Sequence, residues 1–386
     1  MDLHRRLRWH RPIAGVMAAI CAAGMLMASQ PGPASAAAPN AARDELPSAL
    51  VTLGDSFISG EGGRWQGNSD TTGGNRDGTD RAYTGKGINP YDPRIVYGAS
   101  YDNHCDRSDS AEGRSSGVLS AQINMACSGA TTANIINTPF KGEPPQSDQL
   151  LATMKTYNVQ LVAVSIGGND LGFTDIISSC VKAYLLNRDP CNAAQQAAVQ
   201  QRLGPAMANV AAAIAKIKSI VGDGTRIILQ SPPSPVPRAG EMRYPETDPN
   251  SSRTRFGGCP FWNADADWAR DKLVSEISTA LAKVAADQKV DFLDLHDALQ
   301  GREVCAGASN LVTSAAPPSA VTNEWARFLV SGYTQGDQQE SFHPSYFGQL
   351  ALGRCLALMA AKPNIHQAGC LNTPNAGPEG MYLDLV

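Results

Sequence analysis

The sequence predicts an α/β fold, a three-layer α/β/α sandwich around a five-stranded, mainly parallel sheet that disulfide bonds stabilise. Three observations support this prediction. Short apolar runs alternate along the chain with longer helical patterns. Strands separated by helices need crossover connections, which place helices on both faces of a parallel sheet. The predicted mature chain also keeps an even number of cysteines, as expected for a protein that folds in an oxidising compartment.

Five segments are predicted as strands because they are short, apolar and bounded by turn-forming residues. They cover residues 49–53, 123–126, 159–166, 225–229 and 290–295. Three segments show helical patterns and cover residues 193–221, 265–288 and 345–361. Proline has no N–H group and clashes with the preceding turn, so Gly204-Pro205 is expected to interrupt the first of these helices.

Residues 1–36 are predicted to be a cleaved secretion signal. Arginines precede an apolar run over 13–27, and Ala34-Ser35-Ala36 offers the small residues that a signal peptidase requires. The apolar run is shorter than the roughly 20 residues that span a bilayer. Arg5-Arg6 leaves a twin-arginine export route open beside the general one. We therefore expect a secreted, extracellular protein with no integral membrane segment.

After a flexible segment over 37–46, residues 47–386 are predicted to form a single domain with long loop insertions near 60–104 and 230–260. Loops this long are usually functional or disordered, and in a parallel sheet they emerge where ligands bind. The first loop contains Asp and Asn residues at 70, 75, 77 and 80, which makes calcium an alternative. No EF-hand spacing with its closing glutamate is present, so the sequence predicts no metal and no cofactor.

The charge distribution argues against nucleic acid as a partner. The formal net charge is −4, and no block of like charge occurs. Proteins that bind nucleic acid present a basic patch or stripe, which this sequence lacks. We therefore expect no nucleic acid partner.

The cysteines fall in neighbouring pairs along the chain. Nine are present, and loss of Cys21 with the signal leaves eight, namely Cys105 and Cys127, Cys180 and Cys191, Cys259 and Cys305, and Cys355 and Cys370. Four sequential disulfides are the simplest arrangement, although eight cysteines permit about a hundred connectivities. A metal site is the alternative, but the sequence has no C-x-x-C pair and no clustered histidine partner.

Ser56 and His343 are the candidate nucleophile and base. Ser56 follows the first predicted strand, and His343 stands just before the last predicted helix. A serine needs a base to accept its proton and donors aimed at the developing oxyanion. Taken alone, Ser56 could cap a helix and His343 could be structural. Gly113-Arg-Ser115-Ser-Gly117 matches a rival nucleophile motif, but the polar residues before it cannot form the buried strand that this motif requires.

Four blocks in the sequence resemble the GDSL or SGNH hydrolases and occur in the order of that family. Gly54-Asp55-Ser56 is similar to the first block, with Phe57 in place of the usual leucine. The run over 124–131 is similar to the second block and supplies Gly129. Gly167-Gly168-Asn169-Asp170 is similar to the third block, and Glu340-x-x-His343 resembles the last, usually Asp-x-x-His.

The resemblance implies an SGNH-hydrolase-like fold and a serine ester hydrolase. Ser56 would attack the acyl carbonyl and His343 would act as general base. The backbone N–H groups of Ser56 and Gly129 and the side-chain amide of Asn169 would bind the oxyanion. Glu340 would orient His343. The alternatives are Asp337 or a backbone carbonyl, which some secreted actinobacterial lipases use in place of the acid.

Secreted actinobacterial esterases and lipases are the most similar branch of the family. Cys105-Asp106-Arg107-Ser108 followed by Cys127-Ser128-Gly129 resembles their disulfide-bearing second region, which implies a Cys105–Cys127 bond. We therefore expect a monomeric carboxylic-ester hydrolase that acts on a small-molecule or lipid ester. It would be an esterase or a lipase, and a phospholipase of type A is one form that the lipase could take. The alternatives are an acyltransferase with the same acyl-enzyme, a carbohydrate O-acyl esterase and a non-catalytic secreted binding protein.

Overall fold

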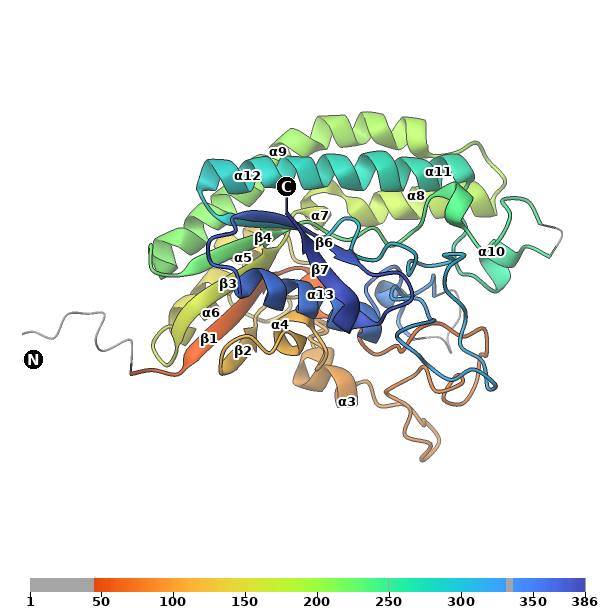
Figure 1. The fold of residues 1–386 in the computed structure, drawn as a ribbon, viewed down its shortest axis with the longest axis horizontal. Coiled ribbons are helices and arrows are strands. Elements are labelled where there is room, and N and C mark those ends of the chain that lie inside the picture. Colours follow the sequence, from red (N-terminus) through yellow and green to blue (C-terminus); the bar gives the residue numbers. More distant parts are fainter. Residues whose placement is uncertain (1–44, 249, 331–335, 386) are drawn as a thin grey trace, which may run out of the picture.

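The computed structural model describes residues 45–248, 250–330 and 336–385 (Figure 1). The predicted secretion signal and Cys21 lie outside the described residues, as does most of the predicted flexible segment. Among the residues described, no helix is both long enough and apolar enough to cross a membrane.

A seven-stranded sheet in the order β2-β1-β3-β4-β5-β6-β7 forms the centre of the fold. Its strands are β1 (Ser48–Gly54), β2 (Ala121–Asn124), β3 (Asn158–Ser165), β4 (Arg226–Gln230), β5 (Asp291–Asp294), β6 (Gln367–Asn372) and β7 (Met381–Asp384). The strands β1 to β6 are parallel to one another, and β7 pairs with β6 in the antiparallel direction. Each of the five predicted strands is present, and the predicted α/β class with a mainly parallel sheet is confirmed.

The prediction of five strands was wrong because β6 and β7 were missed. β6 has the sequence Gln-Ala-Gly-Cys-Leu-Asn, which lacks a β-branched apolar run, and β7 has only four residues. These two strands lie at one end of the sheet, where β7 is the edge strand and β6 is its inner neighbour, and sequence demands are weaker toward an edge. Their pairing depends on the rest of the sheet being in place.

Helices cover both faces of the sheet and complete the three layers (Figure 1). The helices are α2 (Ser56–Ser59), α3 (Arg94–Tyr97), α4 (Glu112–Ser115), α5 (Thr132–Ile136), α6 (Gln146–Thr153), α7 (Gly168–Leu171), α8 (Phe173–Leu185), α9 (Asn192–Val221), α10 (Ser252–Arg255), α11 (Asn263–Trp268), α12 (Ser275–Gln288) and α13 (Tyr346–Ala360). α9 and α12 pack together on one face, and α4 packs with α13 on the other.

Two helical segments differ from their sequence predictions. α9 continues through Pro205, which was expected to interrupt it. Val199 and Ala206 are buried on either side of that proline, so packing against the sheet and neighbouring helices outweighs the local preference. The predicted helix over 265–288 is divided by a π-helical segment, Ala269–Val274, between α11 and α12. The π-helical segment contains Arg270, which is fully buried and forms ion pairs with Asp297 and Glu303.

The eight cysteines of the predicted mature chain form four disulfides between sequence neighbours. They join Cys105 to Cys127, Cys180 to Cys191, Cys259 to Cys305, and Cys355 to Cys370. This is the simplest of the connectivities that the sequence allowed. The first of them ties the loop after β2, which carries Gly129, to the segment before α4.

Candidate active site

The turn after β1 places Ser56 at the carboxyl edge of the sheet. Gly54 has φ +140°, and a Cβ atom there would lie 1.9 Å from the carbonyl oxygen of Ser165, so only glycine fits. The Asp55 carboxylate accepts the Phe57 N–H at 3.2 Å and begins α2 at Ser56. Strand and turn together fix the direction in which the Ser56 side chain leaves the sheet.

Gln146 holds this turn from the side and was not identified from the sequence. Its side-chain oxygen accepts the Gly54 N–H, and its amide group donates to the Gly54 carbonyl, each at 2.8 Å. The residue is buried at the start of α6. The contact joins residues far apart in sequence, and no local pattern marks it.

The predicted oxyanion donors lie on the loops that follow the two strands beside β1. Gly129 follows β2 with φ +81°, and Asn169 follows β3 in the short helix α7. Asn169 donates from Nδ2 to the carbonyl oxygen of Ala130 at 2.9 Å, which links the two loops. Both residues line the same cavity as Ser56.

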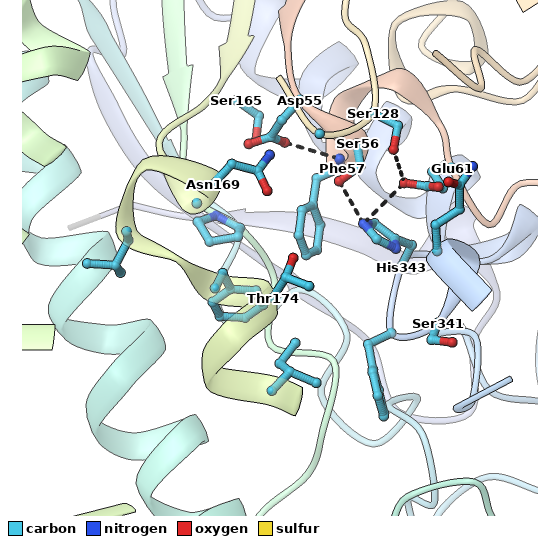
Figure 2. A pocket seen from close by; sticks show the side chains of 18 of the residues that line it. Asp55, Ser56, Phe57, Glu61, Ser128, Ser165, Asn169, Thr174, Ser341 and His343 are labelled. Carbon is cyan, nitrogen blue, oxygen red and sulfur yellow. Dashed lines mark hydrogen bonds and ion pairs between the residues drawn. The ribbon is translucent and has the colours of Figure 1, made fainter. Parts of the chain in front are cut away.

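His343 lies within hydrogen-bond distance of Ser56, with 2.7 Å between Nε2 and Oγ (Figure 2). The preceding residue, Phe342, is buried with φ +63°, a conformation that costs free energy and that proteins often retain at functional sites. Backbone hydrogen bonds of 2.8 Å from Phe342 to Arg327 and from Arg327 to His343 hold the loop. The Phe57 ring packs against the imidazole with the ring centres 5.0 Å apart.

The structure does not bring the Glu340 carboxylate to His343, and this corrects the prediction that Glu340 orients the imidazole. The buried carboxylate accepts the Tyr97 hydroxyl at 2.7 Å and the Trp65 indole N–H at 2.8 Å. Asp337 donates its backbone N–H to Glu340, at 3.0 Å. Glu340 therefore fastens the loop before His343 to the first long insertion.

His343 Nδ1 is buried and makes no hydrogen bond of good geometry within the described part of the chain, although backbone carbonyls of residues 339–341 lie near the imidazole. Burial lowers the pKa of His343 to about 4, while the backbone carbonyls of Ser341, Gln339 and Glu340 act in the opposite direction. The imidazole is therefore neutral at neutral pH, which is the state in which Nε2 can accept a proton.

The low pKa of His343 predicts an unusual pH dependence. If neutral His343 is the base, kcat/KM should be constant from about pH 8 down to about pH 5. It should then fall as the pH drops through about 4 and His343 takes a proton. Steady-state rates on an uncharged ester, with circular dichroism to show that the protein stays folded, would measure this. An acid limb centred near pH 6.5 would contradict the assignment.

A cavity of about 820 Å³ opens at Ser56 and His343. Asn169 and Glu61 lie in its polar part (Figure 2), and Gly129 also lines the cavity. The rest of its wall is largely apolar and includes Phe173, Ile177, Val181, Met207, Ile277 and Leu281. These six residues come from α8, α9 and α12, so the cavity runs from the edge of the sheet under the helices of one layer. Both predicted loop insertions contribute to the wall. The first supplies Glu61 and His104, which lie at its two ends, and the second supplies Pro232.

Other serines and histidines have different partners. Ser231 donates to Asp294 at 2.7 Å, but both nitrogens of the nearby His296 bind carboxylates, so His296 cannot serve Ser231 as a base. Ser115, from the rival motif, donates to the carbonyl oxygen of Gln349 at 3.0 Å. His366 binds Asp291 with its side chain largely exposed.

One group of potential metal ligands occurs among the described residues, and the calcium alternative predicted for the first insertion is a second. Cys180, Cys191 and Asp265 lie together, but the two sulfurs are joined in a disulfide. In the first insertion, the Asp80 carboxylate binds Arg64 and Arg76, each at 2.7 Å. The Asp80 carboxylate is therefore engaged by arginines and is not free to bind a calcium ion.

Comparison with known proteins agrees with the sequence blocks. The GDSL-like lipase/acylhydrolase family matches the chain from residue 52 to residue 309. An esterase from Streptomyces scabiei is 28% identical over 214 residues, which are 50% of this chain and 59% of that esterase. The chain thus matches little more than half of the length of this relative.

Solved structures that match the chain include an extracellular lipase from Streptomyces rimosus and an aryl esterase from M. smegmatis. The lipase has a TM-score of 0.49 and 21% identity, with 81% of this chain and 99% of the lipase covered. The aryl esterase has a TM-score of 0.33 and 14% identity, with 82% and 99% covered. These values are too low to carry an argument about fold or function. The family match covers more than half of the sequence, and the chain therefore belongs to the GDSL-like lipase/acylhydrolase family.

Proposed function

We propose that this protein is a secreted serine ester hydrolase in which Ser56 is the nucleophile and His343 is the general base. The observation that carries the proposal is the 2.7 Å contact between Ser56 Oγ and His343 Nε2 at the mouth of a cavity. Four disulfides and the apolar run within residues 13–27 support export.

In the first half of the reaction, Ser56 Oγ bonds to the acyl carbon while His343 Nε2 takes the serine proton. The carbonyl electron pair moves to oxygen, where the N–H groups of Ser56, Gly129 and Asn169 stabilise the negative charge. The bond to the alcohol then breaks, and His343 returns the proton to the departing alcohol. An acyl-enzyme on Ser56 remains.

In the second half, water replaces the alcohol. His343 takes a proton from the water while its oxygen bonds to the acyl carbon. The tetrahedral adduct collapses, the bond to Ser56 Oγ breaks, and the serine recovers its proton from His343. No oxidant, reductant or metal is needed at any step.

The apolar wall favours esters whose acyl group is a hydrocarbon chain. Each CH₂ group that moves from water into an apolar site contributes about 0.8 kcal/mol, or roughly fourfold in an equilibrium constant. We therefore expect kcat/KM on p-nitrophenyl esters to rise from acetate to octanoate, by up to about fourfold for each CH₂ group, until the cavity is filled. Initial rates across the series, at substrate concentrations below the micellar range, measure this.

Val181→Phe is the matched variant for this experiment because Val181 lies in α8 on the apolar wall. The larger ring should lower kcat/KM on octanoate at least about tenfold and leave acetate nearly unchanged. The acetate rate also shows that the variant is folded. If the wild type releases no nitrophenol from any ester above the buffer rate, the proposed function is wrong.

A further inference from the structure

Glu61 is buried beside the nucleophile, and neither the sequence blocks nor the proposed reaction gives it a role. It follows α2, and its backbone N–H donates to the carbonyl oxygen of Ser56 at 3.3 Å. Its residue surface is 1% exposed, yet it forms part of the cavity wall. Figure 2 shows its carboxylate between Ser128 and His343.

One carboxylate oxygen of Glu61 lies near both halves of the catalytic machinery. Oε2 accepts the Ser128 hydroxyl at 2.6 Å and lies 3.6 Å from His343 Nε2. The second distance is too long for a hydrogen bond, so the Ser128 contact is the directional one. Oε1 is buried without a hydrogen-bond partner among the described residues. A buried polar atom without a partner destabilises a fold, and its retention here favours a role in the site.

Lys141 binds the backbone of Ser128, the residue whose hydroxyl group contacts Glu61. Its ammonium group donates to the Ser128 carbonyl oxygen at 2.8 Å and also to the carbonyl oxygen of His104. The Ser128 backbone N–H in turn donates to the carbonyl oxygen of Cys105, at 3.1 Å. The donor, the acceptor and the hydroxyl of Ser128 are thus all engaged.

These contacts matter because the Ser128 carbonyl and the Gly129 N–H belong to one peptide unit. A peptide unit is planar and trans, so fixing the direction of its C=O also fixes the opposite direction of its N–H. Gly129 itself has no side chain with which to resist rotation, and its φ of +81° is open to alternatives. The orientation of the predicted oxyanion donor therefore depends on Ser128.

The hydrogen bond from the Ser128 hydroxyl to Glu61 does not require Glu61 to be charged. Burial raises the pKa of Glu61 well above its ordinary value, and Asp106 and Glu340 add to the effect, whereas Ser128 and Lys141 oppose it. A neutral acid still offers an oxygen to the Ser128 hydroxyl.

We propose that Glu61 and Lys141 are positioning residues that clamp the Ser128–Gly129 peptide unit, so that the Gly129 N–H points at the oxyanion. The inference rests on the proposed function, because it assigns these residues to the same reaction. It predicts a loss in the transition state and not in substrate binding. Displacing a catalytic group by about 1 Å can cost about a hundredfold in rate.

The test compares Glu61→Leu, Glu61→Gln, Ser128→Ala and Lys141→Met with the wild type on p-nitrophenyl butyrate. Glu61→Leu, Ser128→Ala and Lys141→Met should each lower kcat about 10-fold to 100-fold, with KM changed less than about threefold. Glu61→Gln keeps the acceptor oxygen and should retain kcat within about threefold. The double variant Glu61→Leu/Ser128→Ala should lose no more than the worse single variant, because both remove one contact.

Inhibition by an acyl trifluoromethyl ketone, which forms an oxyanion on Ser56, gives a second readout. Its affinity should fall by the same factor as kcat/KM across the variants. The proposal is overturned if Glu61→Leu has wild-type kcat, if the two losses multiply in the double variant, or if Glu61→Gln is as impaired as Glu61→Leu. Wild type and Ser56→Ala run in the same assay separate this result from the proposed function, which fails only if the wild type shows no hydrolysis that depends on Ser56.

Discussion

Ser56→Ala is expected to lower kcat on short acyl esters by about 10⁴-fold or more, because it removes the proposed nucleophile, on which the acyl-enzyme would form. The fold should be unaffected, since only Oγ is lost and its contact is with His343. His343→Ala should cost a similar factor. The double variant should be no worse than either single one, because nucleophile and base act as one unit.

Ser115→Ala is the matched control. Ser115 belongs to the rival nucleophile motif and donates to a backbone carbonyl away from the cavity. Its kcat should remain within about twofold of the wild type. Measured rates at saturating ester, with the Ser56→Ala protein purified separately to avoid carry-over, decide between the two serines. A Ser56→Ala enzyme with wild-type kcat and an inactive Ser115→Ala enzyme would reverse the assignment.

Asn169→Ala should give the second largest loss, about 10²-fold to 10³-fold in kcat. Its amide group donates to Ala130 with one hydrogen and has a second for the oxyanion. Removing it deletes a donor whose contribution grows as the carbonyl oxygen becomes charged, so KM should change little.

The surface residue Asn137 supplies the control for the same substitution, because it is exposed and is not part of the cavity wall. Asn137→Ala should keep kcat within about twofold. A large rise in KM for Asn169→Ala at unchanged kcat would show that Asn169 binds the substrate and does not stabilise the oxyanion.

The sequence predicted the sheet wherever a strand is buried on both faces. The run in β3 is apolar and β-branched because helices cover both sides of it, and such a strand can be recognised locally. β6 and β7 lie toward the edge and carry polar residues, so their identity depends on neighbours that a local pattern does not contain. Pro205 and the π-helical segment before α12 show the same dependence for helices.

The residues of the candidate site also fall into those that the sequence could predict and those that it could not. Ser56, Gly129 and Asn169 follow adjacent parallel strands, so their convergence follows from topology once the strands are placed. Gln146 and Glu61 contact Gly54 and Ser128, which are distant from them in sequence, and no spacing rule marks such pairs. The prediction that Glu340 contacts His343 was wrong because a separation of three residues in sequence indicates proximity but not the direction of a side chain. Trp65 and Tyr97 determine that direction.

Reaction of the purified protein with a fluorophosphonate ester, followed by peptide mass spectrometry, tests the central claim most directly. The reagent bonds covalently to a serine only where a base and oxyanion donors activate it. We predict one adduct for each chain, located on Ser56, and none in the Ser56→Ala or His343→Ala proteins. An adduct on another serine, or no adduct on the folded wild-type protein, would contradict the account.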